Sequence, residues 1–380
     1  MSDAEEFHVI AYDLNTNARL CEIPANNLRF DSRLNDAGAI SFDISLQSPG
    51  VAGQVASILG YEGNPYAVYV DRNGVIVWGG ICWTGLYTRS SGLLSVGGKE
   101  FLSYFDQRIA AADYSQLTYP AGIDPAQLLA LALTDAQNIA LQGAGASIGL
   151  SVVYTASGIP VIVPGYPIAQ QTAIQSIIND VTALVVPGFG GTDIQVLCAY
   201  DAFGVPQRTA YTRSPRSGNP AGSTGLIFDL SSCIDYTWPT DATQAGNTLI
   251  VTGSGNGAAA PTTTVNAPGV PLGGLGQSPR LDKLITTTAQ SQQQVQQMAN
   301  GLAQQYGKPV TTPTVTILTN GAQPLGSWSM GDDARLYMPP GDDRFPNGKS
   351  EYWRVVQQQI SVPDAGAATA VLTFNVPPSF

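Results

Sequence analysis

Histidine and cysteine are scarce in this sequence, which narrows the chemistry that it can support. His8 is the only histidine, so a Ser-His-Asp or Cys-His site would have to use it, and a metal site built from several histidines is excluded. It lies at the start of the first predicted strand, and we interpret it as a surface or packing residue. The cysteines form no C-x-x-C pair, so a zinc or redox site is not indicated. We interpret these four residues as buried free thiols: Cys21, Cys82, Cys198 and Cys233.

Charged residues are also scarce, at 12% of the chain, with a formal net charge of −11. An average domain carries roughly 25% charged residues. No basic stripe is present to neutralise phosphates, which argues against specific nucleic-acid binding, and the acidic balance would suit a conduit that repels DNA. The scarcity of charge indicates either surface that is buried in an assembly or the compositional bias of a GC-rich genome.

Long apolar runs are absent as well. No window reaches 18 uninterrupted apolar residues, so we expect no transmembrane helix and no membrane insertion. The first residues, 1–6, are acidic and lack the basic start and apolar run of a signal peptide. We therefore expect the chain to be made and folded in the cytoplasm.

The first hundred residues have the pattern of β-strands. Apolar residues at Phe42, Ile44 and Leu46 alternate with polar neighbours, which is the period of a half-buried strand. Two β-rich runs flank Asn73-Gly74, a pair that favours a two-residue hairpin turn. Gly79-Gly80 then indicates a bulge or a close approach of backbone.

Helices enter the pattern in the middle of the chain. Asp124-Pro125 predicts a helix start, with the helix over 126–141, and a second helix is predicted over 168–185. Between them, 143–167 reads as a loop with strands. Strand character returns at 194–200, before a Pro/Gly/Ser loop over 213–225.

The last third combines strands with one more helix. Three short strands are predicted within 226–252, and 253–279 is the longest candidate flexible loop. A helix follows over 281–306, ended by Gly307. The last part, 310–380, is β again, with strands predicted at 314–318, 334–338, 352–360 and 368–376.

The order of these elements predicts an α+β chain that is mostly β, with two barrels or sandwiches and insertions. A length of 380 residues favours two or three domains. We place the boundaries at 1–109, at 110–225 for an inserted α/β domain, and at 226–380 for a second β domain that includes the helix over 281–306.

Few residues present a pattern of chemistry. Gly253-Ser254-Gly255-Asn256-Gly257 lacks the last glycine of a dinucleotide loop and precedes no helix, so we interpret it as a turn. The pairs Asp332-Asp333 and Asp342-Asp343 could serve glycoside hydrolysis or bind calcium, but they lie in Gly-adjacent turns where aspartate is common. No catalytic site, metal site or cofactor is predicted.

Four aromatic residues near these turns are candidates for binding. Such residues suit stacking on a sugar, but equally an ordinary strand core or a subunit interface, where Trp and Tyr are enriched. The candidates for interface or glycan contacts are Trp328, Tyr337, Tyr352 and Trp353.

Three early segments, read in order, resemble the opening barrel of the baseplate hub or minor tail proteins of tailed phages. They are a small-apolar strand, a hairpin that ends in Trp-Gly-Gly, and a glycine followed by Tyr-Phe and Arg. The matching positions are 39–46, 66–80, Gly98, Tyr104, Phe105 and Arg108. Later matches to the family are Tyr236, Trp238, Pro239, Asp241, Asn247, Gly253, Gly255, Gly326, Trp328, Gly331, Asp332, Arg354 and Val355.

The resemblance to the siphophage tail-tip hub implies a structural role without catalysis. It implies two β-barrel-like hub domains with an inserted α/β domain and a helix-containing insertion. It further implies a homotrimeric ring in the virion that continues the tail tube at its tip. The implied partners are the distal tail protein or tube, the tape-measure protein, and other tail-tip or fibre proteins. A receptor- or carbohydrate-binding tail protein is the alternative, and a cell-wall hydrolase using the aspartate pairs is a third.

Overall fold

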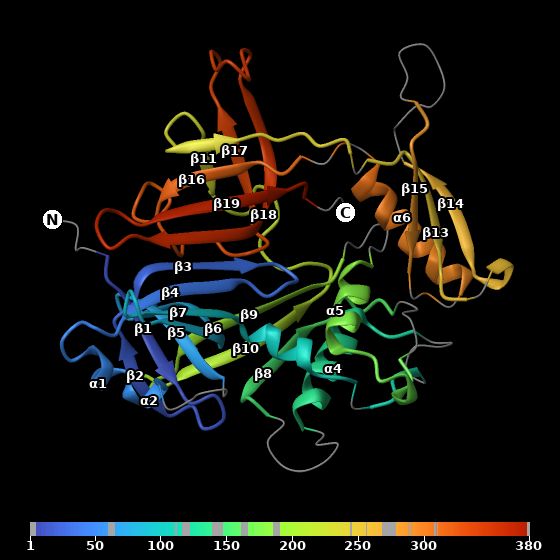
Figure 1. The fold of residues 1–380 in the computed structure, drawn as a ribbon. Coiled ribbons are helices and arrows are strands. Elements are labelled where there is room, and N and C mark those ends of the chain that lie inside the picture. Colours follow the sequence, from blue (N-terminus) through green and yellow to red (C-terminus); the bar gives the residue numbers. More distant parts are fainter. Residues whose placement is uncertain are drawn as a thin grey trace.

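The computed structural model gives a mostly β fold arranged as two stacked lobes with additional units at one side (Figure 1). The structure describes residues 5–59, 65–110, 112–115, 122–138, 147–160, 166–184, 191–243, 245–255, 257–267, 279–287, 289, 291–307, 309 and 311–377. The predicted mostly β, α+β class is confirmed.

The N-terminal lobe is a curved antiparallel sheet in the strand order β3-β4-β7-β6-β5-β1-β2. Its strands are β1 (Phe7–Tyr12), β2 (Arg19–Ile23), β3 (Asn26–Arg33), β4 (Ala39–Ser45), β5 (Tyr66–Arg72), β6 (Val75–Thr88) and β7 (Leu93–Glu100). Two short helices, α1 (Val51–Gln54) and α2 (Ala56–Leu59), pack against β2.

The predicted Asn-Gly hairpin joins β5 and β6. Asn73 and Gly74 have φ angles of 51° and 85°, as a turn of this length requires, and Arg72 pairs with Val75 across it. The close approach expected at Gly79 is also present, because a Cβ atom there would lie 2.6 Å from the Cys198 sulfur. The two glycine sites therefore fix the hairpin and its contact with a later strand.

An insertion unit packs beside this sheet. It contains α4 (Pro125–Asn138), α5 (Ile174–Thr182) and a mixed sheet of β8 (Leu150–Thr155), β10 (Pro206–Arg213) and β9 (Asp193–Tyr200). The short 3-10 segments are η1 (Phe101–Gln107) and η2 (Ile168–Gln170). The helix predicted from 168 begins only at Ile174, because Gln171 adopts a left-handed conformation, φ 48°, that ends the preceding turn. The predicted residues 139–141 and 185 lie outside the described ranges.

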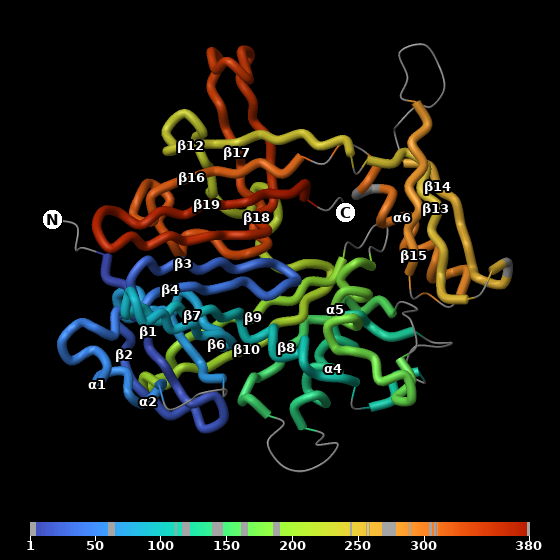
Figure 2. Tube along the Cα trace, in the orientation of Figure 1, coloured from blue at the N-terminus to red at the C-terminus, as the bar shows by residue number. Residues whose placement is uncertain are grey.

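The C-terminal lobe contains the remaining strands of the large sheet. They are β11 (Ile227–Asp229), β12 (Asp235–Thr237), β16 (Thr314–Leu318), β17 (Asp333–Met338), β18 (Lys349–Val362) and β19 (Thr369–Asn375). β17 and the first half of β18 form a tall hairpin, and the second half of β18 pairs with β19 and β3. Figure 2 shows this hairpin rising above the lobe.

The pairing of β18 with β3 makes one sheet of both lobes, with Ile360 opposite Phe30. Its described strands do not close into a barrel, since the path ends at β2 on one side and β12 on the other. The expected barrel-like domains are thus curved, open portions of a shared sheet. Shared backbone hydrogen bonds hold the lobes together.

A side unit contains the predicted third helix, which starts later than the sequence predicted. The helix α6 runs over Gln292–Tyr306, not from 281, because Ser291 caps its start with a hydrogen bond from the Gln294 backbone at 3.3 Å. Before it, β15 (Asp282–Thr286) pairs with β13 (Thr248–Thr252), which also pairs with β14 (Thr262–Asn266). The predicted loop 253–279 therefore contains a strand, and the 3-10 turn η3 (Gly257–Ala259); its residues 268–278 lie outside the described ranges.

Two hydrophobic cores result from this layout. β5 is buried on both faces: Val68 and Val70 join the core that continues into the C-terminal lobe, whereas Tyr69 joins the core under the insertion unit. Tyr69 contacts Phe101, and Arg208 of β10 lies over the Phe101 ring, 4.6 Å from its centroid. The boundaries proposed at 109/110 and 225/226 stay predictions.

Candidate functional site at the junction of the two lobes

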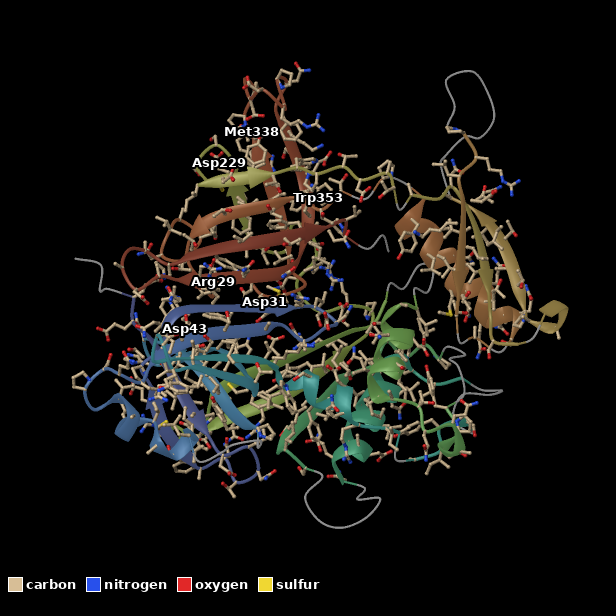
Figure 3. The ribbon with its side chains drawn as sticks, in the orientation of Figure 1. Arg29, Asp31, Asp43, Asp229, Met338 and Trp353 are labelled. Carbon is tan, nitrogen blue, oxygen red and sulfur yellow. The ribbon has the colours of Figure 1, made fainter. Side chains whose placement is uncertain are left out.

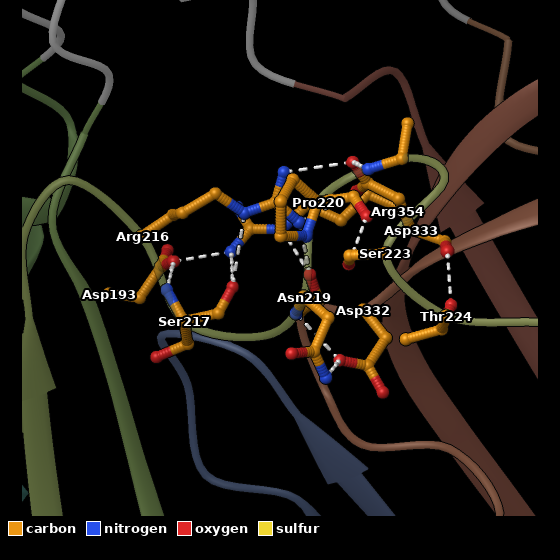
Figure 4. Close-up of polar contacts among 12 residues, drawn as sticks. Asp193, Arg216, Ser217, Asn219, Pro220, Ser223, Thr224, Asp332, Asp333 and Arg354 are labelled. Carbon is orange, nitrogen blue, oxygen red and sulfur yellow. Dashed lines mark hydrogen bonds and ion pairs between the residues drawn. The ribbon is translucent and has the colours of Figure 1, made fainter.

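A buried network of charged residues joins the insertion unit to the C-terminal lobe (Figure 4). Arg216 follows β10, and its guanidinium grips the carboxylate of Asp333, with Nη1 to Oδ2 at 2.9 Å and Nη2 to Oδ1 at 2.7 Å. A second ion pair connects Arg354 of β18 to Asp193 of β9. Both pairs are almost fully shielded from solvent. Because buried charges need partners, these four residues hold one another in place.

Asp332 organises the loop beside this network. Its Oδ1 accepts hydrogen bonds from the Asn219 backbone at 2.7 Å and side chain at 2.9 Å, and its Oδ2 accepts from the Ser329 backbone at 2.8 Å. These donors occupy the carboxylate, which is only 4% exposed. The arrangement suits a structural clamp better than a catalytic acid or a calcium ligand.

Two glycines allow the loops of the network to touch. Gly218 has φ +77°, and a Cβ atom there would lie 2.1 Å from the backbone carbon of Gly331. Gly331 has φ +92° and would likewise collide with the Ser217 backbone. Close backbone contact therefore reinforces the ion pairs.

A third strand ends at the same junction. In the turn after β3, the Asn35 side chain accepts a hydrogen bond from the Ile194 backbone at 2.8 Å and donates one to Asp193 at 3.2 Å. Asp193 thus contacts residues from both lobes. The junction sets the orientation of the lobes and the insertion unit relative to one another, which is a positioning function.

The four predicted aromatic residues do not form one surface. Trp328 and Trp353 are buried, with 4% and 7% exposure, and Trp353 packs edge-to-face on Trp238 with ring centroids 5.3 Å apart. Tyr337 and Tyr352 lie on the outer side of the β17–β18 hairpin, where Tyr352 is 40% exposed. Figure 3 places Trp353 in the C-terminal lobe. Of these four candidates, Tyr352 is therefore exposed, Tyr337 is half-buried, and both tryptophans are buried.

The other predicted candidates have ordinary structural partners. His8 hydrogen-bonds Glu22 at 2.8 Å, and this bond raises the pKa of His8. Asp342 accepts hydrogen bonds from the Tyr236 hydroxyl and two backbone N–H groups, which lower its pKa. All four cysteines are free; Cys21 and Cys82 are buried, and Cys198 and Cys233 are half-buried. Within the described ranges, no group of three or more His, Cys, Asp or Glu residues could hold a metal ion.

Three solved structures share this architecture along nearly the whole length of the chain. No protein-family model and no curated protein matches the chain. Among solved structures, it is similar to the 43 kDa tail protein of prophage MuSo2 from Shewanella oneidensis, with TM-score 0.59, 15% identity and coverage of 98% of this chain and 97% of that one. The tail protein from Neisseria meningitidis MC58 follows, with TM-score 0.56, 12% identity and coverage of 97% and 96%. Prophage tail protein gp18 from Listeria monocytogenes EGD-e has TM-score 0.53, 13% identity and coverage of 96% and 94%.

The chain has the fold of these tail proteins. In this tail-protein fold, the residues that carried the sequence resemblance have identifiable structural roles. Arg108 donates two hydrogen bonds to the Ala136 carbonyl, at 3.1 and 2.7 Å, near the end of α4. Asn247 is buried and bridges Pro279 and Leu281 in the side unit. Gly331, Asp332 and Arg354 meet in the junction.

The sequence alone did not identify Asp193 and Arg216 as members of the buried ion pairs. Arg216 lies in the segment that the sequence predicts as a Pro/Gly/Ser loop, and Asp193 directly precedes the strand predicted at 194–200. The available signal was an arginine among turn residues in a chain with few charges. Such a signal identifies a possible buried pair but not the partner.

None of the helices in the described part of the chain is long and apolar enough to cross a membrane.

Proposed function

We propose that this chain is a structural protein of a phage tail, placed at the tail tip as a hub that forms a homotrimeric ring. The main support is the structural similarity to three tail proteins, each of which covers 96% or more of this chain. Nearly all of the chain is therefore accounted for by the shared fold.

The junction supports a structural role for the chain, because it holds the lobes at a fixed angle. A ring subunit must keep its lobes at a constant angle, since a change in angle would alter every contact around the ring. Two buried ion pairs and the β3–β18 pairing supply that constancy. The clamped state of Asp332 and Asp333 supports a structural role over hydrolysis.

One segment of β6 is suited to contact between subunits. Residues 84–88 of β6 pair with β7 on one side and with no other described strand. Leu86 and Tyr87 are 68% and 52% exposed there. A strand edge that has apolar side chains and no partner among the described strands favours addition of a strand from a neighbouring subunit.

The proposed ring would continue the tail tube. It would meet the tube or a distal tail protein on one face, surround the end of the tape-measure protein, and carry other tail-tip or fibre proteins. The carbohydrate-binding alternative requires the four candidate aromatic residues to form one exposed surface. It is less well supported, because Trp328 and Trp353 are buried.

Cryo-electron microscopy of the phage particle tests the proposal, together with light scattering of the purified full-length chain. Three copies around the tip of the tube are expected, and a trimer in solution at high concentration. Copies placed outside the tube, or a monomer that never enters the particle, would overturn the hub assignment.

A further inference from the structure

A cavity of about 210 Å³ lies where three parts of the fold meet. The N-terminal lobe contributes Trp78 and Glu100, the insertion unit contributes Gln195 and Cys198, and the C-terminal lobe contributes Trp328 and Gln358. Since a water molecule takes about 30 Å³ in the liquid, the space exceeds what a single water fills. It can hold a small ligand with several non-hydrogen atoms.

One side chain that lines the cavity, that of Gln195, has an oxygen without a hydrogen-bond partner. Gln195 is only 6% exposed, and its Oε1 accepts no hydrogen bond. Leaving a buried acceptor unpaired destabilises a fold. The last torsion of a glutamine side chain is broad, so the amide oxygen can turn toward a bound donor at low cost. The cavity therefore favours a ligand that donates a hydrogen bond.

Glu100 can place a negative charge at the cavity wall. Glu100 is 8% exposed, and burial raises its pKa to about 8, with the negative charge of Asp31 adding to the effect. Arg33 also lines the cavity, but its guanidinium lies 2.7 Å from Asp31 and 3.5 Å from Asp36. Two carboxylates hold this one cation, so it does not neutralise Glu100. Glu100 is mostly protonated at neutral pH and ionised above about pH 8, so a cationic donor is preferred over a neutral one as the pH rises through this value.

Most of the remaining lining is apolar, with Ser32, Ser329 and Gln358 as further polar members. Val77, Trp78, Leu325, Trp328 and Met330 surround the polar groups. We propose that this cavity binds a primary alkylammonium group of the size of a lysine side chain, with its methylene chain against the apolar walls and its ammonium directed to Gln195 and Glu100. This proposal rests on the residues that line the cavity and is independent of the proposed role in a phage tail. The ammonium could come from a lysine of a neighbouring chain or from a free amine.

Titration of the full-length chain with n-butylammonium chloride tests the site directly. Fluorescence of Trp78 and Trp328 in the cavity wall should change saturably, whereas equal concentrations of 1-butanol should produce a change at least tenfold weaker. Binding should strengthen from pH 6 to pH 9, because Glu100 becomes ionised; Asp31, Arg33 and Cys198 are the other titratable groups that face it. Absence of saturation by 100 mM amine, or equal binding of the alcohol, would overturn the proposal.

A variant separates binding from folding. Gln195→Met removes the acceptor and keeps the side chain's length, so butylammonium affinity should fall at least tenfold while the melting temperature stays the same or rises. Gln207→Met, on the exposed side of β10, is the matched control and should leave affinity unchanged. Unchanged affinity in Gln195→Met would refute the site. In a map of the assembled particle, cavity density continuous with a neighbouring chain identifies a lysine, and isolated density identifies a free amine.

Discussion

Arg216 and Asp333 are 117 residues apart in the sequence, yet they form a two-pronged ion pair that is 6% and 2% exposed. The pair spans the boundary between the insertion unit and the C-terminal lobe. A planar guanidinium matches a carboxylate in this geometry better than a lysine could. The orientation of the two units therefore depends on one specific pair of side chains, supported by Arg354 and Asp193.

Removal of one partner of this pair should be costly. We expect Arg216→Met to destabilise the fold by about 3–5 kcal/mol, because Asp333 would be left charged and buried. Chemical unfolding of the variant measures the effect. Arg280→Met is the control, since the Arg280–Asp282 pair is more than half exposed and worth less than about 1 kcal/mol. Similar shifts in both variants would contradict the role of burial.

Two glycines in one loop allow a matched test of backbone contact. Gly218 and Gly222 have similar φ angles, +77° and +80°, but only Gly218 lies against another backbone. Alanine at Gly222 should cost about 1–2 kcal/mol, from the left-handed conformation alone. Gly218→Ala should cost distinctly more, because its Cβ would collide with Gly331. Melting temperatures compare the two variants, and equal losses would rule out the close contact as a constraint.

The buried carboxyl of Glu100 should give the protein a specific pH dependence. Its folded-state pKa, about 8, lies above the ordinary value of 4.5, so the folded chain holds an extra proton between these values. Stability should therefore decrease as pH rises from about 5 to 8. Glu100→Gln removes this contribution. As the pH rises from about 5 to 8, the melting temperature of the variant should therefore increase relative to that of the wild type. Glu351→Gln, at a half-exposed position, should follow the wild type. Parallel curves for Glu100→Gln and wild type would contradict this account.

The role of residues 84–88 of β6 in assembly can be tested by substitution. We expect Leu86→Glu to abolish trimer formation while the chain stays folded, because a charge on the strand edge opposes pairing with a neighbour. Light scattering and circular dichroism measure the two properties. Leu284→Glu is the control, since Leu284 is 70% exposed on the separate side unit. A trimer that survives Leu86→Glu would place the subunit contact elsewhere.

Local patterns predicted much of the β structure. The Asn73-Gly74 turn needs positive φ angles that few other residue pairs supply, so its two flanking strands were predictable. The strands predicted at 314–318, 334–338, 352–360 and 368–376 agree closely with β16 to β19. Side-chain alternation is a local property, and it survives in strands that have one polar face.

Other features depended on contacts between distant segments. The predicted start of the third helix was wrong, because Asp282–Thr286 found a parallel partner in β13 and Ser291 could cap a later start. Trp353 and Tyr352 are neighbours in the sequence, but only the register of β18 decides which ring is buried. Composition alone does not distinguish the two faces.

The sequence by itself determined the mostly β class, the positions of most strands and the scarcity of catalytic chemistry. Each follows from residue types and spacings within short stretches. The tertiary structure alone decided that both lobes share one open sheet through β3 and β18, and that Arg216 pairs with Asp333. The reason is physical: partners more than a hundred residues apart are chosen by the path of the chain and by the cost of burying an unpaired charge.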